Sequence, residues 1–124
     1  MAVNDGRETI LLVEDQKGVR AFTRSALEDI GYHVLDAGDG DDAIAMAEGH
    51  PGPIHVLLTD LNLPGLDGRA VGERLKAMRP GLKVIVMSGY PGDFLGKSNS
   101  QAFLPKPYGP VELADKVRQV LGKS

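Results

Sequence analysis

The sequence predicts a doubly wound α/β domain, in which a five-stranded parallel sheet carries helices on both faces. Five short apolar runs alternate with segments whose apolar residues recur at helical spacing. This alternation favours strand–helix–strand units, and their right-handed crossovers bring the carboxyl ends of all strands to one edge of the sheet. Several apolar runs end in polar or charged residues, which predicts a functional site along that edge.

Length and composition fit a single domain. The chain has 124 residues, of which 42% are hydrophobic, and we expect a flexible segment at 1–8 followed by the domain at 9–122. No apolar run reaches membrane-spanning length, and the polar first residues carry no secretory signal. The basic residues are scattered and outnumbered by acidic ones, 14 to 17, so we expect no direct nucleic-acid binding. The absence of cysteine is compatible with a reducing compartment, and we expect a cytoplasmic protein.

The first half of the domain contains two predicted strands and two predicted helices. The run 9–13 is continuously apolar and reads as a buried strand. A helix ending at Gly31 follows, because apolar residues recur at helical spacing at Val19, Phe22, Ala26, Leu27 and Ile30. The run 33–37 is less apolar, which predicts an edge strand. A short helix then opens with the acidic stretch 39–42, which we interpret as a helix cap, and ends at Gly49.

The second half repeats the alternation. The strand 54–59 is strongly apolar, and a helix follows from about Gly68. The fourth strand is predicted at 83–87. The fifth, at 102–105, is short, and its proline suits an edge position. The last helix begins at Pro110, because proline is favoured in the first turn of a helix.

The segment 89–101, between the last two strands, is unusual. It carries three glycines and a proline, which both oppose helix formation. We therefore expect one or two helical turns at most within a mobile loop, so that the fourth helix is shortened.

The polar residues at the strand ends share a chemistry. Asp60 closes the third strand. The ends of three other strands carry Glu14, Asp15, Ser88 and Lys106. Taken singly, these four residues fit ordinary roles in helix caps, turns and the solvated surface. Asp60 fits them less well, because an isolated charge at the end of so apolar a strand needs a partner. Gathered at one sheet edge, three carboxylates, a hydroxyl and an ammonium describe a site for Mg²⁺ and a phosphoryl group.

Physical chemistry supports this interpretation. Converging carboxylates repel and raise one another's pKa unless a cation joins them, and Mg²⁺ prefers a partly hydrated all-oxygen site. Asp60 can act as a carboxylate nucleophile toward phosphorus. The metal and Lys106 would then bind the equatorial oxygens, and the Ser88 hydroxyl would donate to one of them.

Four motifs carry a family resemblance. They are Leu-Val-Glu-Asp at 12–15, Thr-Asp-Leu-Asn-Leu-Pro-Gly-Leu-Asp-Gly at 59–68, Met-Ser-Gly-Tyr at 87–90 and Phe-Leu-Pro-Lys-Pro-Tyr at 103–108. With them the chain resembles a response-regulator receiver domain of two-component signalling, and is most similar to receivers of hybrid histidine kinases. The resemblance implies a flavodoxin-like fold with strand order 2-1-3-4-5.

The resemblance also implies a phosphorelay function. Asp60 would accept a phosphoryl group from a phosphohistidine on a histidine kinase or histidine phosphotransfer protein. The implied Mg²⁺ ligands are Asp15, Asp60 and the backbone carbonyl of Asn62, with Glu14 acting through water. The domain would be a signalling phosphoacceptor rather than an enzyme, assisting its own phosphorylation and slow dephosphorylation.

Further roles follow from the same resemblance. Lys106 and Ser88 match the phosphate-binding pair, and Lys106-Pro107 matches a peptide bond that is usually cis. Phe103 matches the aromatic switch that turns inward when Ser88 moves toward phosphate. Tyr90 matches a position that tunes attack by water on the acyl phosphate, and its bulky ring is expected to slow dephosphorylation.

The short segment 89–101 departs from the family pattern. Receivers commonly dimerise through helix four, strand five and helix five, and we do not expect the usual dimer because this surface must be altered. The chain ends directly after its last predicted helix, so a free-standing regulator and a receiver from a longer kinase both fit.

Two other functions compete with phosphoacceptance. A haloacid-dehalogenase-type phosphatase needs a second aspartate two positions after Asp60, where Asn62 stands, which argues against turnover. A phosphorylation-independent, receiver-like interaction module is the alternative that stays open. Such modules typically lack part of the acidic pocket or the lysine, whereas this chain retains both.

Overall fold

The structure is a computed structural model that describes residues 7–89 and 102–122. Its strands are β1 (Thr9–Val13), β2 (His33–Ala37), β3 (Val56–Asp60), β4 (Lys83–Ser88) and β5 (Ala102–Pro105). They pair in parallel in the order β2-β1-β3-β4-β5. The predicted fold class and strand order are therefore confirmed.

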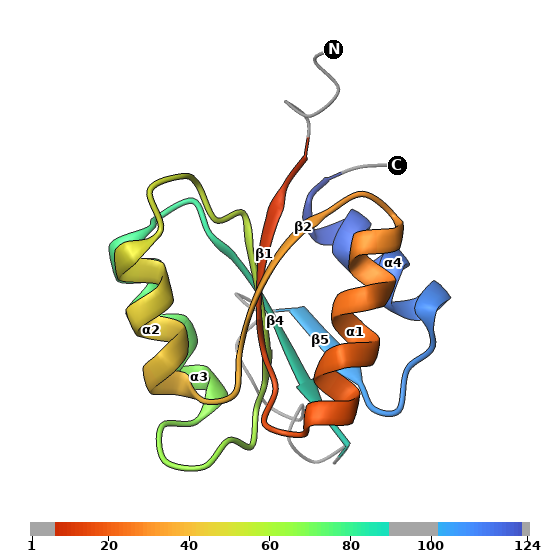
Figure 1. Cartoon of the computed structure of the whole chain (residues 1–124), viewed down its shortest axis with the longest axis horizontal. Helices are drawn as coiled ribbons and strands as arrows, with labels where there is room; N and C mark the ends of the chain where they lie inside the picture. The colour runs from red at the N-terminus through yellow and green to blue at the C-terminus, as the bar shows by residue number, and fades with distance from the viewer. Residues whose placement is uncertain (1–6, 90–101, 123–124) are drawn as a thin grey trace.

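Helices cover both faces of the sheet (Figure 1). The helices are α1 (Lys17–Asp29), α2 (Gly40–Gly49), α3 (Gly68–Met78) and α4 (Pro110–Val120). α2 and α3 contact each other on one face, and α1 and α4 contact each other on the other face. The helices of the described ranges thus lie in two pairs, one on each face of the sheet.

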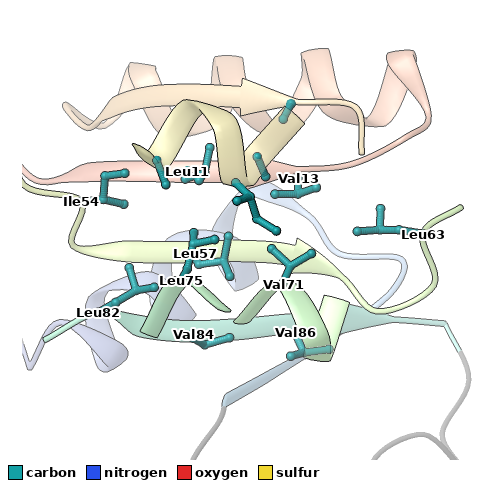
Figure 2. Close-up of a cluster of buried hydrophobic side chains, with 14 of the residues drawn as sticks. Leu11, Val13, Ile54, Leu57, Leu63, Val71, Leu75, Leu82, Val84 and Val86 are labelled. Carbon is teal, nitrogen blue, oxygen red and sulfur yellow. The ribbon is translucent and has the colours of Figure 1, made fainter. Parts of the chain in front are cut away.

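The strands supply two cores because alternate side chains point to opposite faces. The core beneath α2 and α3 includes Leu11, Val13, Leu57, Val71, Leu75, Val84 and Val86 (Figure 2). The core beneath α1 and α4 includes Ile10, Leu12, Leu27, Leu58, Ile85, Met87, Leu113 and Val117. Since the central strands are buried on both faces, they read as continuous apolar runs in the sequence.

Most predicted boundaries agree with the structure, and β3 differs by a small shift. We predicted 54–59, whereas the strand begins at Val56 and includes Asp60. The reason is the neighbouring strand, because Ile10 of β1 pairs with Val56. Ile54 is still buried in the core beneath α2 and α3.

The apolar pattern predicted for the first helix is only partly buried in α1. Phe22 and Ile30 share that pattern, but they are 44% and 47% exposed. The helix instead buries Leu27 and a polar residue, Thr23. The Thr23 hydroxyl lies 2.7 Å from the hydroxyl of Tyr108, in the loop after β5, and this hydrogen bond accounts for its burial.

The acidic stretch 39–42 caps a helix, as interpreted from the sequence. The Asp39 side chain accepts a hydrogen bond from the Asp42 backbone N–H at 2.8 Å. Asp67 caps α3 in the same way through the N–H of Ala70. Pro110 is the first residue of α4, as predicted.

Two predictions concern residues outside the described ranges. The shortened helix expected within 89–101 lies almost entirely there, as does most of the flexible segment expected at 1–8. Within the described ranges, every helix is too short or too polar to cross a membrane.

Arg79, which follows α3, stabilises the connection between α2 and β3. Its guanidinium donates to the carbonyls of Ala47, His50 and Gly52 at 2.8–2.9 Å. Replacement of Arg79 by alanine leaves these carbonyls without a charged donor, so we expect a loss of about 2–3 kcal/mol in the free energy of unfolding. Urea denaturation measures it. The exposed Arg74 on α3 supplies the control, and an equal loss in Arg74→Ala would contradict this role for Arg79.

Candidate functional site

Asp60 lies at the carboxyl end of β3 and is only 7% exposed. The strand end is fixed by the Leu61 N–H, which donates to the Met87 carbonyl at 2.8 Å. Gly68, at the start of α3, packs against the same backbone and donates its N–H to the Leu61 carbonyl. A Cβ atom on Gly68 would lie 2.2 Å from the Asp60 carbonyl oxygen, so only glycine fits there.

Glu14 and Asp15 follow β1 and differ in exposure. Glu14 is fully buried and Asp15 is exposed. The Glu14 backbone N–H donates to the Ala37 carbonyl, which extends the pairing of β1 with β2. One carboxylate oxygen of Glu14, Oε2, accepts a hydrogen bond from the Gln16 backbone N–H at 3.0 Å. Glu14 is thus held from both its backbone and its side chain.

Lys106 joins two of the carboxylates. Its Nζ donates to Glu14 Oε1 at 2.8 Å and to Asp60 Oδ2 at 3.0 Å. Its backbone N–H donates to the Ser88 carbonyl, which extends the pairing of β4 with β5. The peptide bond between Lys106 and Pro107 is cis, as the family resemblance implied. The residues expected to form the pocket therefore meet at one sheet edge.

The three carboxylates are close enough to share a cation. Glu14, Asp15 and Asp60 each offer an oxygen, and these oxygens lie within 4.8 Å of one another. Asp15 and Asp60 also line an open hollow of about 790 Å³, together with Asn62 and Lys106. Oxygen ligands beside a space that opens to solvent suit Mg²⁺, which usually keeps several water ligands.

Burial and charge set the electrostatics of the pocket. Burial raises the pKa of Asp60 to about 6; the Glu14 charge adds to this rise, and Lys106 opposes it. Burial lowers the pKa of Lys106, but its hydrogen bonds and attraction to Glu14 and Asp60 outweigh this and raise the pKa overall. The pocket therefore holds one ammonium against two buried carboxylates, an excess of negative charge that favours a cation.

The two residues expected to form the switch, Ser88 and Phe103, lie on neighbouring strands and differ in burial. Ser88 ends β4 and is buried, and it follows Met87, the residue that pairs with Asp60. Phe103 lies on β5 and packs, partly buried, against the core beneath α2 and α3. These positions do not test a coupled movement of Ser88 and Phe103, and the proposed switch stays a prediction.

Reasoning from strand ends missed several residues around the pocket. The Gln16 N–H and the Arg20 guanidinium both donate to Glu14. Tyr108 lines the hollow and bonds to Thr23. Burial raises the pKa of Tyr108, although its bond to Thr23 opposes this. A backbone N–H carries no sequence signal, and the roles of the side chains depend on elements far away in the sequence.

The fold and the pocket together define a class. A doubly wound 2-1-3-4-5 sheet, with clustered carboxylates and a lysine at its carboxyl edge, has the architecture of a receiver. The chain belongs to the response regulator receiver domain family, whose sequence pattern matches residues 10–118. It is therefore a receiver domain of two-component signalling.

Individual relatives support the same assignment. The chain is 34% identical over 122 residues to "Sensor kinase CckA" of Brucella abortus (strain 2308). This alignment covers 95% of the chain but only 13% of the length of CckA. It is 30% identical to "Response regulator receiver protein CpdR" of the same organism, covering 90% and 95% of the two chains. The crystal structure of the receiver domain from the hybrid histidine kinase CckA superposes with a TM-score of 0.80 at 35% identity, covering 91% and 98%. The similarity to hybrid-kinase receivers is confirmed.

Proposed function

We propose that this domain is the phosphoacceptor of a phosphorelay, in which Asp60 takes a phosphoryl group from a phosphohistidine in the presence of Mg²⁺. The main support is the position of the Asp60 carboxylate, 3.0 Å from Lys106 Nζ and clustered with Glu14 and Asp15. It also lines a hollow that opens to solvent. A nucleophile, a counter-charge and a place for the donor thus occur together.

In the proposed transfer, the phosphoryl group moves from the donor histidine directly to Asp60. An Asp60 carboxylate oxygen forms the new P–O bond as the P–N bond to histidine breaks, and the electron pair of that bond stays on the imidazole nitrogen. Lys106 would bind a phosphoryl oxygen with the ammonium that now contacts Asp60. Ser88, on the adjacent strand end, would donate its hydroxyl to another phosphoryl oxygen.

The residues present fit Mg²⁺ in the roles that the family resemblance implied. Asp15, Asp60 and the Asn62 carbonyl would hold the ion, with Glu14 acting through water. When bound, the ion would neutralise charge on the carboxylates and on the phosphoryl oxygens. The exposed Asp15 suits a direct ligand role, and the buried Glu14, already bonded to Lys106 and Gln16, suits an indirect one.

Signal output would follow from the Ser88–Phe103 pair. Movement of Ser88 toward the phosphoryl group would free space for the Phe103 ring to turn inward, changing the surface that partners contact. Phe103 has no hydroxyl, so packing space rather than a hydrogen bond would drive this rotation. Tyr90, proposed to slow dephosphorylation, lies outside the described residues.

The hollow beside Asp60 also offers a surface for the phosphodonor protein. Its lining includes Gly18, Val19 and Phe22 of α1, and Pro107 and Tyr108 after β5. We propose that a histidine kinase or histidine phosphotransfer protein rests here while its histidine reaches Asp60. These partners would place the domain in the cytoplasm.

A charge on this surface should impair protein donors selectively. Phe22→Glu puts a carboxylate on the apolar wall of the hollow, and we expect phosphotransfer from a protein donor to fall at least about 10-fold, the effect of 1.4 kcal/mol of lost binding. Uptake from acetyl phosphate should be unchanged. Ile30→Glu is the matched control, because Ile30 is about as exposed as Phe22 but lies just beyond the C-terminal end of α1 and does not line the hollow. Equal rates of phosphotransfer from the protein donor to Phe22→Glu and Ile30→Glu would contradict the proposed docking surface.

Incubation with acetyl phosphate separates the proposal from its alternative. With Mg²⁺, the intact mass of the protein should rise by one phosphoryl group, and a chelator should prevent the gain. A chain that gains no mass with any small donor would instead act as a phosphorylation-independent interaction module.

A further inference from the structure

Arg20 lies behind the acidic pocket and contacts its backbone. We infer that Arg20 is a positioning residue for the proposed Mg²⁺ site, acting through the main chain of Glu14; the inference rests on the proposed function. The Arg20 Nη1 atom donates to the Glu14 carbonyl oxygen at 2.7 Å. Arg20 does not line the hollow beside Asp60 but a separate one between β2 and α2. It therefore approaches the pocket from outside and is not placed to bind the phosphoryl group.

The Glu14 carbonyl is a sensitive point of contact. Glu14 stands one residue beyond the last pair between β1 and β3, which joins Val13 to Thr59. Its N–H is held by the Ala37 carbonyl and its own carbonyl is held by Arg20. The contact with Arg20 thus fixes the peptide unit that links Glu14 to Asp15, and with it the directions of both side chains.

Arg20 is itself held in place. Its Nε lies 3.4 Å from Asp36 Oδ2 on β2, and Arg24 binds the other oxygen of Asp36 at 2.5 Å. Gly38 provides the space for this arrangement, since a Cβ there would lie 3.0 Å from Arg20 Nη1. The Arg20 side chain is only 21% exposed. A guanidinium fixed on two sides can transmit the position of β2 to Glu14.

The physical consequence concerns the affinity for the metal. Groups that orient metal ligands from behind typically change metal affinity by about 10–100-fold when removed. Loss of the Arg20 contact would remove the hydrogen bond to the carbonyl of the peptide between Glu14 and Asp15 and leave that peptide less restrained. The carboxylates would then have to be ordered when the ion binds, which weakens binding without removing any ligand.

The test is the binding of Mg²⁺ alone, measured by titration calorimetry. We expect Arg20→Gln to weaken the affinity about 10-fold. Arg20→Lys keeps the charge and a single donor nitrogen but cannot reach both Glu14 and Asp36 as the guanidinium does, so its affinity should lie between those of wild type and Arg20→Gln. The control is Arg24→Gln, because Arg24 shares Asp36 as a partner but otherwise pairs with Glu28. Its Mg²⁺ affinity should stay within twofold of wild type.

A second readout separates positioning from general loss of structure. Phosphoryl uptake from acetyl phosphate by Arg20→Gln should be slow at low Mg²⁺ and recover to the wild-type rate at saturating Mg²⁺. Unchanged affinity in folded Arg20→Gln or Arg20→Lys, or an equal loss in Arg24→Gln, would overturn the inference. If the wild type binds no Mg²⁺, the proposed function itself fails, and the inference fails with it.

Discussion

Replacing Asp60 by asparagine should abolish phosphoryl uptake and stabilise the protein in the absence of metal. The amide is not a nucleophile toward phosphorus, so no phosphoryl group should be gained from either protein or small donors. The metal-free variant should be more stable than wild type, because burial and the Glu14 charge raise the pKa of Asp60 to about 6. At pH 7 the folded protein thus carries an unfavourable charge, which asparagine removes.

The sign of the pH dependence follows from the raised pKa. A carboxyl group that holds its proton more tightly when folded favours the fold below its unfolded pKa of about 4, and this contribution is lost as the pH rises through about 6. We expect metal-free Asp60→Asn to exceed wild type by on the order of 1–2 kcal/mol at pH 7, and by less at pH 5.

Urea denaturation with a chelator present measures this difference at both pH values. Addition of Mg²⁺ should reverse it, because the ion stabilises the protein whose ligand set is intact. Asp41→Asn, at an exposed carboxylate on α2, is the control and should show neither effect. A phosphorylated Asp60→Asn protein, or a metal-free variant less stable than wild type at pH 7, would contradict this account.

Substitution of Gly68 by alanine should damage both the fold and the site. The added Cβ would lie 2.2 Å from the Asp60 carbonyl oxygen and 3.0 Å from its carbonyl carbon. Backbone atoms cannot rotate away as side-chain atoms can, so the end of β3 or the start of α3 must shift. We expect a loss of about 2–3 kcal/mol in the free energy of unfolding, as for other overpacked sites. Phosphoryl uptake should slow because Asp60 moves with its backbone.

Gly49→Ala is the matched control for this effect. Gly49 ends α2, and a Cβ there meets no atom of the described residues within 4 Å. Alanine is favoured over glycine in helices by up to about 1 kcal/mol, so this variant should be as stable as wild type or slightly more stable. Equal urea midpoints and equal uptake rates for Gly68→Ala and Gly49→Ala would show that the close approach to Asp60 has no consequence.

Much of the fold could be predicted from the sequence, because the strands are buried on both faces and therefore stand out as apolar runs. The meeting of the candidate site residues at one sheet edge could be predicted as well. Asp60, Lys106 and Glu14 lie far apart in the chain, but each ends or follows a strand, and parallel topology brings such positions to one edge. The shifted start of β3 could not be predicted, because it depends on where β1 begins to pair.

Other features depend on contacts that leave no periodic signal. The apolar pattern of α1 suggested Phe22 and Ile30 as core candidates, yet Thr23 is buried in their place because Tyr108 supplies its hydrogen bond. The role inferred for Arg20 depends in the same way on Asp36, which comes from another strand. A single sequence shows which residues can bond but not which distant partner they meet.

Peptide-resolved mass spectrometry after incubation with acetyl phosphate and Mg²⁺ tests the central claim most directly. We expect one phosphoryl group, confined to the peptide that contains Asp60, present in wild type and absent both in Asp60→Asn and after chelation of the metal. A phosphoryl group on another residue, or none on a folded chain that binds Mg²⁺, would show that Asp60 is not the phosphoacceptor.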